Sequence, residues 1–375
     1  MGKVVILQEH IPHYRIAVWN NLNAELAKVG HQLEVVAGNA PSTAKFVDGM
    51  DQLECGVRVK NYWLGNSFYW QPVLSRVMSA DLLVVQQELK ILVSYAAIIS
   101  RFLIAKPKRL AVWGHGRNYQ ELSEGPFRRV VRNWMVRRCD HCFGYTDSSR
   151  DALIERGVPP NRITVIYNSI NTEAISEARI RSTPQFRRTT RRRLGISEGA
   201  FVAVFCSRLH RQKKIPFLIE SVLAAKEKLP NLEVLIIGSG EMEADLKKMA
   251  VGLDWVHLVG EQYDSDLADY LIASDVFLMP AHLGLSIIDA FSAGLPIIVG
   301  DFRNHSPEID YLENNVNGVM ANPVSSDFAD AIVELGKNPA LVKTMSAEAV
   351  KTSTRRDLKS MVANFYSGID TVLDR

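Results

Sequence analysis

The chain has 375 residues, of which 47% are hydrophobic and 23% are charged, and its formal net charge is +3. These ordinary globular values exclude a disordered, collagen-like or disulfide-scaffold protein, and the length predicts two or three domains. Four cysteines are too few for a secreted disulfide framework, and the Cys139/Cys142 pair has no second pair with which to bind zinc. The longest apolar segment, residues 91–105, is interrupted by Arg101 and is too short to span a bilayer, so we expect a buried helix in a cytoplasmic protein.

The first half of the chain alternates short apolar strands with longer amphipathic stretches. Between the first two strands, Val18, Leu22, Leu26 and Val29 recur at helical spacing. This rhythm predicts an α/β domain with a doubly wound parallel sheet and helices on both faces. The expected strands are Val4–Gln8, Leu33–Ala37, Leu82–Gln86, Leu110–Trp113, Cys142–Tyr145 and Thr164–Tyr167.

An arginine-rich break, without any strand-like run, precedes a second series of strands. We expect an N-terminal Rossmann-like domain over residues 1–172, a basic linker over 173–195 and a second Rossmann-like domain over 196–355. The apolar stripe of residues 356–375 predicts a helix that either caps the second domain or crosses back to join the first. The second series of strands comprises Phe201–Cys206, Glu233–Ile237, Val256–Val259, Val276–Met279 and Ile297–Val299.

Ligands of open parallel sheets lie beyond the carboxyl ends of the strands, so the loops there are the candidate sites. Arg208 and Lys213 follow Phe201–Cys206, and two cations at a strand exit suit a diphosphate, although a solvated basic loop is the alternative. Gly238 and Gly240 follow the next strand, where glycines let backbone approach a ligand. A GxG pair is also common in ordinary turns, so this signal is weak alone.

Two further loops contain candidate binding groups. Gly284 precedes a predicted helix whose N-terminal amides can bind an anion, and Asp289 in its early turns can accept hydrogen bonds from a ribose. In the first half, His115 stands between two glycines after a strand, and we expect it to titrate near neutrality and to contact substrate. A histidine in a surface loop is the alternative.

Basic residues are concentrated in the middle of the chain. Residues 101–195 contain 20 Lys and Arg residues against 8 Asp and Glu residues. Within them, Phe127–Arg138 has an amphipathic pattern that predicts either peripheral contact with an anionic membrane or an ordinary surface helix. The arginine run near 187–193 lacks interleaved aromatic residues apart from Phe186, so we expect no nucleic-acid partner.

In order and spacing these motifs resemble the retaining glycosyltransferases of family 4, which have the GT-B fold of two Rossmann-like domains facing a cleft. The resemblance is strongest from Asp140 to Asn322 and looser in the N-terminal half. Its strongest segments are Asn161–Asn168, the Arg208/Lys213 pair, Gly238–Gly240, Gly284–Pro296, Pro307-Glu308 and Asn317-Gly318; its looser ones are Pro12–Arg15 and Gly114–Gly116.

The resemblance implies transfer of a sugar from a UDP- or GDP-linked donor, without a metal ion or other cofactor, to a glycan or lipid-linked acceptor in bacterial surface polysaccharide synthesis. It implies that His115, Arg208 and Lys213 are the catalytic residues: the two cations hold the diphosphate and His115 faces the donor sugar. It also implies that Asp289 binds ribose. The other donor-binding residues that it implies are Gly238, Gly240, His282, Leu283, Gly284, Leu285 and Ser286, and the acceptor-side residues are His13, Tyr14 and Arg15.

One position departs from the family pattern. The first acid of the family's E-x7-E motif is replaced by Ala281, with His282 as a neighbouring substitute. This loss keeps open a non-catalytic nucleotide-sugar-binding protein, and a sugar-nucleotide epimerase or phosphorylase of the same fold remains the enzymatic alternative. We find no pair of carboxylates suited to double displacement, which favours same-face substitution with retention.

Overall fold

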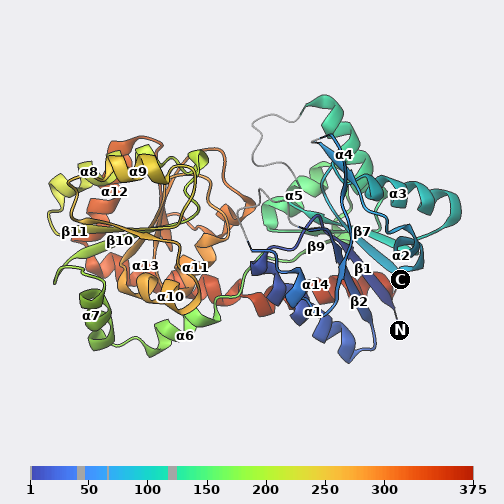
Figure 1. Cartoon of the computed structure of the whole chain (residues 1–375), viewed down its shortest axis with the longest axis horizontal. Coiled ribbons are helices and arrows are strands. Elements are labelled where there is room, and N and C mark those ends of the chain that lie inside the picture. Colours follow the sequence, from blue (N-terminus) through green and yellow to red (C-terminus); the bar gives the residue numbers. More distant parts are fainter. Residues whose placement is uncertain (1, 40–46, 66, 117–124, 375) are drawn as a thin grey trace. The chain divides into compact units, whose positions relative to one another are not determined.

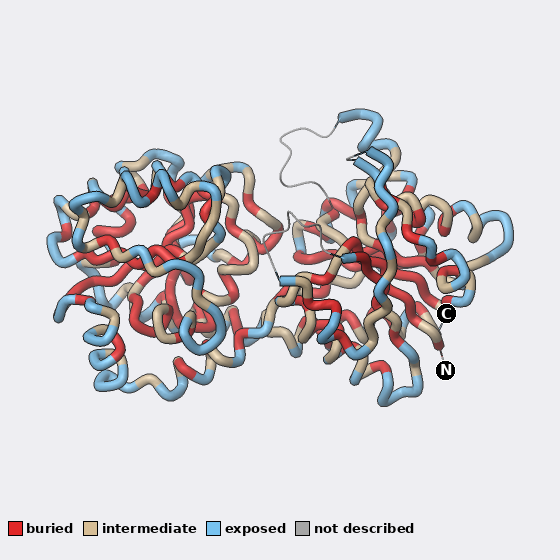
Figure 2. The backbone as a smooth tube through the Cα atoms, viewed as in Figure 1, coloured by how far each residue is buried: buried red, intermediate tan, exposed pale blue. Residues whose placement is uncertain are grey.

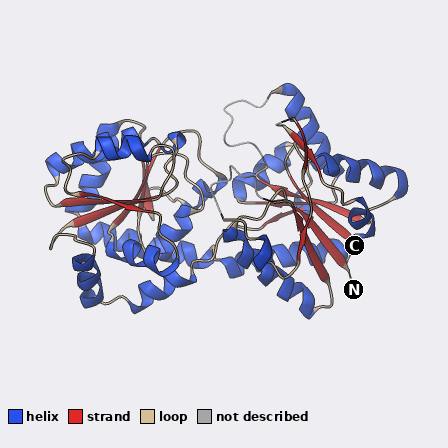
Figure 3. Cartoon of the chain, in the orientation of Figure 1, coloured by secondary structure: helices blue, strands red, loops and turns tan. Residues whose placement is uncertain are grey.

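The chain folds into two compact units that each contain a parallel sheet. The computed structural model describes residues 2–39, 47–65, 67–116 and 125–374 (Figure 1). The first unit comprises Met1–Asn171 and Leu358–Arg375, and the second comprises Thr172–Asp357. In both units helices flank the sheet (Figure 3), and most residues of the central strands are buried (Figure 2).

The first unit is built on a seven-stranded parallel sheet of order β3-β2-β1-β6-β7-β8-β9. All six strands expected in this half are present. The sequence pattern missed the three-residue strand β3 and a separate antiparallel pair, β4 and β5, because such short runs show no clear alternation. The strands are β1 (Lys3–Leu7), β2 (Gln32–Ala37), β3 (Gly56–Arg58), β4 (Tyr62–Leu64), β5 (Phe68–Trp70), β6 (Leu82–Gln86), β7 (Arg109–Gly114), β8 (His141–Gly144) and β9 (Ile163–Val165).

Alternate residues of the central strands enter two separate cores. Val4 and Ile6 of β1 belong to one core and Val5 and Leu7 to the other, because successive side chains point to opposite faces of a sheet. Helices α1 and α14 cover the first face, and α2 to α5 contribute to the second. The helices of this unit are α1 (Ile16–Lys28), α2 (Leu74–Ser79), α3 (Leu92–Ile104), α4 (Pro126–Arg138), α5 (Asp147–Glu155) and α14 (Leu358–Leu373).

The C-terminal helix α14 completes the core of the first unit, which is one of the two placements that the sequence left open. Phe365 is fully buried, and its ring centroid lies 4.5 Å from that of Phe143, 5.8 Å from Trp113 and 6.0 Å from Trp19. Gly368 is needed for this approach, since a Cβ there would lie 2.4 Å from the Phe143 ring.

The second unit contains a six-stranded parallel sheet of order β12-β11-β10-β13-β14-β15. The chain leaves β10 towards β11 on one side and returns on the other side at β13, so the strand order reverses at β10. Ligands of open α/β sheets bind at such a reversal. The strands are β10 (Phe201–Cys206), β11 (Leu232–Ile237), β12 (Val256–Gly260), β13 (Val276–Met279), β14 (Ile297–Gly300) and β15 (Gly318–Ala321), of which the sequence pattern missed only β15. The helices that follow them are α8 (Ile215–Lys228), α9 (Glu243–Met249), α10 (Asp264–Ala273), α11 (Ser286–Ser292), α12 (Ser325–Lys337) and α13 (Pro339–Arg355).

Residues 173–195, interpreted above as a basic linker, instead form α6 (Glu173–Arg181) and α7 (Pro184–Arg193), which pack against α10. Arg187 and Arg191 of α7 lie 2.7 and 2.6 Å from the two carboxylate oxygens of Asp275, just before β13. The same carboxylate accepts a hydrogen bond from the backbone N–H of Val202 on β10. Part of the arginine run therefore fastens α7 to the end of the sheet.

The Asp275→Asn substitution should lower the free energy of unfolding by about 2–4 kcal/mol, because two arginines then lose their shared, largely buried counter-charge. Urea unfolding followed by circular dichroism measures this loss. Asp269→Asn is the matched control, since Asp269 pairs with Arg193, an arginine that is 61% exposed. The control should lose less than about 1 kcal/mol, and equal losses in the two variants would contradict the assigned role of Asp275.

Candidate functional site

A buried lysine joins two loops at the reversal point of the second sheet. Lys213 ends the short helix η4 (Arg211–Lys213) after β10 and is only 6% exposed. Its Nζ donates a 2.6 Å hydrogen bond to the backbone oxygen of His282, in the loop after β13, and lies 3.7 Å from the sulfur of Met279. Two loops far apart in sequence therefore share one ammonium group.

Burial lowers the pKa of Lys213 to about 8, with Arg208 lowering it further and the Cys206 thiol opposing the shift. At neutral pH the side chain is still largely charged. A buried ammonium whose hydrogen-bond partners are one carbonyl oxygen and one thioether is poorly compensated, and an anion binding beside it would restore the pKa.

Arg208 supplies a second cation at the same strand end. Its side chain is exposed, and within the described part of the chain it makes no hydrogen bond or ion pair. Hydrogen bonds from Ser239 and Tyr263 lower the pKa of Glu261, and the hydrogen bond to Glu261 raises the pKa of Tyr263. The charge of Arg208 adds a smaller lowering effect on both groups, so Arg208 lies near the loop that follows β12. The structure thus brings Arg208 and Lys213 to one end of the sheet, as the sequence predicted.

The glycines after β11 have a packing role that the sequence did not reveal. Gly238 and Gly240 have φ angles of +132° and +154°, and a Cβ at either would lie 2.0 or 2.3 Å from the backbone oxygens of Ser207 and Leu209, respectively. At both glycines, the space that a side chain would need is therefore occupied by backbone oxygens of this chain. Their contact with a donor stays a prediction.

Two side chains that were not predicted from the sequence form hydrogen bonds with the loop after β13. Asn304 uses its side-chain oxygen to accept the His282 N–H at 3.3 Å and its backbone oxygen to bond His282 Nδ1 at 3.0 Å. His305 Nδ1 accepts the Leu283 N–H at 3.1 Å, and its Nε2 bonds the oxygen of Gly300 at 2.9 Å. No local motif marks these residues, because the contact joins two loops about 22 residues apart.

These contacts fix the proton position on His282. Burial and nearby Lys213 lower its pKa, so the imidazole is neutral at physiological pH. A carbonyl oxygen can only accept, so Nδ1 carries the proton towards Asn304 and Nε2 is left as an acceptor. His282 Nε2 can therefore accept a hydrogen bond from a sugar hydroxyl. The neighbouring Ala281 has a completely buried methyl group, which offers no polar contact.

Fewer backbone amides are available before α11 than the sequence suggested. The N–H groups of Ile287 and Ile288 already bond the oxygens of Gly284 and Leu285 at 3.3 and 2.9 Å. Among the described residues, those of Gly284, Leu285 and Ser286 have no hydrogen-bond acceptor. Three successive backbone N–H groups are therefore available to donate hydrogen bonds to a ligand.

Asp289 lies on α11 beneath this loop. Burial raises the pKa of its carboxyl group to about 7. The same carboxylate, after burial itself, contributes to raising the pKa of the Cys206 thiol to about 12, which places the two groups near each other. No donor to Asp289 is found within the described residues, so hydroxyl groups of a ligand would favour its ionised form.

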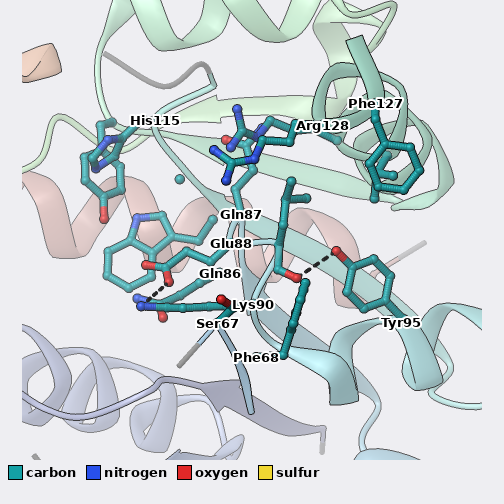
Figure 4. Close-up of a pocket in the computed structure, with 16 residues that line it drawn as sticks. Ser67, Phe68, Gln86, Gln87, Glu88, Lys90, Tyr95, His115, Phe127 and Arg128 are labelled. Atoms are coloured by element: carbon teal, nitrogen blue, oxygen red, sulfur yellow. Dashed lines mark hydrogen bonds and ion pairs between the residues drawn. The ribbon is translucent and has the colours of Figure 1, made fainter. Parts of the chain in front are cut away.

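A cavity of about 630 Å³ opens at the carboxyl ends of β6, β7 and β8 in the first unit (Figure 4). Arg128 lies across it from Lys90, which forms a 3.0 Å ion pair with Glu88 and also pairs with Glu9. None of these charged residues was predicted from the sequence, although Glu88 and Lys90 lie within four residues of the end of a predicted strand. The lining residues are Ser67, Phe68, Gln86, Gln87, Glu88, Leu89, Lys90, Tyr95, Trp113, Gly114, His115, Phe127, Arg128, Val131, Arg132 and Tyr145.

His115 lines this cavity, but our expectation that it titrates near neutrality is wrong. Burial, with the charges of Arg15 and Arg132, lowers its pKa to about 4. Its ring centroid lies 4.4 Å from that of Tyr145, in an edge-on arrangement. A neutral His115 can exchange hydrogen bonds with hydroxyl groups but cannot supply a positive charge.

The three acceptor-side candidates form the short helix η1 (His13–Arg15), and the structure brings one of them to His115. Arg15 is 7% exposed, lies over the Trp113 ring at 5.5 Å and bonds the oxygen of Ser169. Tyr14 is exposed, and its ring contacts His13 edge-on. The role of these residues in binding an acceptor stays a prediction.

The described residues contain neither a metal-binding cluster nor a membrane-spanning helix. No group of three or more His, Cys, Asp or Glu side chains there is arranged to hold a metal ion. Nor does any helix in this part of the chain combine the length and apolarity that crossing a bilayer demands.

Comparison with known proteins agrees with this geometry. The two-domain fold is GT-B: the Anabaena protein HepE, crystallised in complex with UDP, is 18% identical and has a TM-score of 0.73 over 99% of this chain and 100% of its own. Residues 17–174 match the family described as Glycosyltransferase Family 4, and residues 186–352 match Glycosyl transferases group 1. The chain therefore belongs to the family 4 glycosyltransferases.

Two curated relatives have named activities. The alpha-monoglucosyldiacylglycerol synthase of Acholeplasma laidlawii is 25% identical over 62% of this chain and 58% of its own length. The D-inositol 3-phosphate glycosyltransferase of Geodermatophilus obscurus is 28% identical over 65% of this chain and 56% of its own. The chain thus spans less than two thirds of either relative.

The pKa of Lys213 implies that the affinity for the nucleotide depends on pH. Because the ammonium is lost as the pH rises through about 8, affinity for UDP or GDP, whichever binds, should fall about tenfold from about pH 7.5 to about pH 9. Titration calorimetry measures this dependence. In the Lys213→Gln variant, binding should be weak and nearly independent of pH over this range, and a wild-type affinity equally independent of pH would contradict the assignment.

Proposed function

We propose that this protein is a glycosyltransferase that transfers a sugar, with retention of anomeric configuration and without a metal ion, from a UDP- or GDP-linked donor. The observation that carries the proposal is the pair of cations at the carboxyl end of β10: buried Lys213 and exposed Arg208. The family assignment and the UDP named in the HepE structure support it.

The chemistry explains why such cations are needed. Breaking the bond between the anomeric carbon and the phosphate oxygen leaves an additional negative charge on the nucleoside diphosphate. Fixed positive groups stabilise that charge most strongly when they are preorganised and partly buried. Lys213 meets this condition because its hydrogen bond to His282 holds it in place, while Arg208 offers a planar fork for phosphate oxygens.

We propose that the acceptor hydroxyl attacks the face of the sugar from which the phosphate departs. The acceptor oxygen forms the new bond to the anomeric carbon, the electron pair of the broken bond stays on the diphosphate, and a diphosphate oxygen takes the acceptor proton. No carboxylate nucleophile is needed. Consistent with this, Ala281 places a methyl group where the family has its first acid.

The remaining site residues have proposed binding roles. Asp289 accepts hydrogen bonds from ribose, the loop from His282 to Ser286 and the glycines Gly238 and Gly240 contact the rest of the donor, and His115 contacts the donor sugar in its neutral form. The cavity that His115 lines receives the acceptor, and His13, Tyr14 and Arg15 are the other acceptor-side residues.

We propose that the acceptor is a glycan or a lipid-linked molecule used in bacterial surface polysaccharide synthesis. One relative is named for a glucosylated diacylglycerol, which supports a lipid-linked acceptor. The protein would then work in the cytoplasm, on the inner face of the membrane, with Phe127–Arg138 as its contact and with no nucleic-acid partner.

A second candidate is a non-catalytic nucleotide-sugar-binding protein, which the buried methyl group of Ala281 favours. It would bind donor as tightly as an enzyme but transfer sugar to no acceptor. A sugar-nucleotide epimerase would instead convert the donor without any acceptor present, so incubation of the donor alone distinguishes it.

Arg208→Ala and Lys213→Ala should each lower turnover about 100-fold, the size typical of losing one group that stabilises a transition state. Initial rates of sugar transfer with saturating donor measure the effect. Arg211→Ala, which removes an exposed arginine of the same loop, should retain activity within threefold. Turnover of the first two variants within threefold of wild type would contradict the proposed role in phosphate stabilisation.

The ribose contact of Asp289 can be tested without catalysis. Removing the ribose hydroxyls from the nucleoside diphosphate should weaken binding to the wild-type protein about tenfold, because the carboxylate loses its donors. The Asp289→Asn variant should discriminate far less between the ribose and the 2′,3′-dideoxyribose nucleotides in calorimetry. Equal discrimination by the two proteins would place the ribose elsewhere.

A further inference from the structure

The end of α3 exposes a cluster of large apolar side chains, contrary to our expectation of a buried helix over residues 91–105. The buried residues of α3 lie in its first half, among them Ala97 and Ile98. In the last turns, Phe102 is 79% exposed, Leu103 is 70% and Ile104 is 60%. Three consecutive large apolar residues at a helix terminus are unusual on a protein surface that meets only water.

Helix α4 extends this apolar surface. Phe127 and Val130 are 78% and 64% exposed, whereas Met135 and Val136 are buried, so only part of the apolar side of α4 packs inward. The helices α3 and α4 contact each other (Figure 1). The rings of Tyr95 and Trp134 stack across them, with their centroids 6.4 Å apart. A hollow of about 500 Å³ between them is lined by Ile98, Ile99, Arg101, Phe102, Leu103, Trp134 and Arg138.

The charged residues of the two helices that form this surface are all basic. Helix α4 contains five arginines, α3 contains Arg101, and neither helix contains an Asp or Glu residue. Arg101 is neutralised by the bidentate carboxylate of Asp140. Arg129 and Arg138 are exposed, and their side chains make no hydrogen bond or ion pair inside the described ranges. The α3–α4 surface therefore consists of apolar side chains bordered by arginines.

We propose that the α3–α4 surface, defined by Ile99, Phe102, Leu103, Ile104, Phe127, Val130, Trp134, Arg129 and Arg138, docks on an anionic lipid bilayer. Apolar side chains enter the interfacial region of such a bilayer, and each arginine near it contributes about 1 kcal/mol of attraction to anionic headgroups. A second copy of the chain is a poorer occupant, because a self-complementary contact would bring like-charged arginines together.

Docking of this surface also gives the neighbouring cavity a role. Phe127 and Arg128 of α4 line the 630 Å³ cavity of the first unit. A bilayer on the α3–α4 surface would therefore lie beside the cavity that we propose receives the acceptor. The role of the cavity rests on the proposed function, and in it the lipid surface is the source of the acceptor. Docking on the bilayer does not itself depend on catalysis.

The test is co-sedimentation of the full chain with vesicles of phosphatidylcholine alone or with 30% phosphatidylglycerol. The wild-type protein should bind the anionic vesicles. High salt should release part of the bound protein, because it screens the attraction between the arginines and the anionic headgroups. The F102S/L103S and R129E/R138E double variants should each reduce the bound fraction at least fivefold. I180S/V251S is the matched control, because Ile180 and Val251 of the second unit are 74% and 78% exposed, and it should bind like wild type.

Equal binding to both vesicle types, or unchanged binding of both α3–α4 variants, would overturn the proposal. So would a wild-type dimer in size-exclusion chromatography that F102S/L103S converts to a monomer, since the surface would then join copies of the chain. Nucleotide affinity and circular dichroism of each variant show that it is folded. Because binding is measured without donor or acceptor, a protein that binds vesicles but transfers no sugar would contradict only the proposed function.

Discussion

The hydrogen bond from Lys213 to the backbone oxygen of His282 is the interaction on which the candidate site depends. It joins the loops that follow β10 and β13, the two strands between which the sheet order reverses. Asn304 and His305 also hold the second loop through hydrogen bonds to His282 and Leu283, so its conformation is fixed before any ligand binds. Preorganisation of this kind is what makes a buried charge useful for catalysis, because no reorganisation remains to be done in the transition state.

The alternation of strands and helices was predictable because it follows from local hydrophobic periodicity. The Arg208/Lys213 pair was predictable for a similar reason, as a local pattern at a strand exit. The clamp by Asn304 and His305 was not, since it depends on which loops the topology brings together. Nor was the neutral state of His115, which depends on burial and on Arg15 from a distant segment.

The two basic segments of the sequence have different physical roles. In α7, Arg187 and Arg191 converge on Asp275, so the residues that looked like a linker hold the second unit together. In α4, arginines lie beside exposed apolar side chains, and no acidic residue of the same helix pairs with them. Composition alone cannot separate these cases, because the difference lies in what each helix packs against.

We propose that Lys213 and Arg208 hold the departing diphosphate at the carboxyl end of β10. A crystal structure of the protein with the nucleoside diphosphate that it binds tests this claim most directly. We expect diphosphate oxygens within about 3 Å of both the Lys213 ammonium and the Arg208 guanidinium. A diphosphate bound elsewhere, with both cations directed away from it, would contradict this role of the two residues.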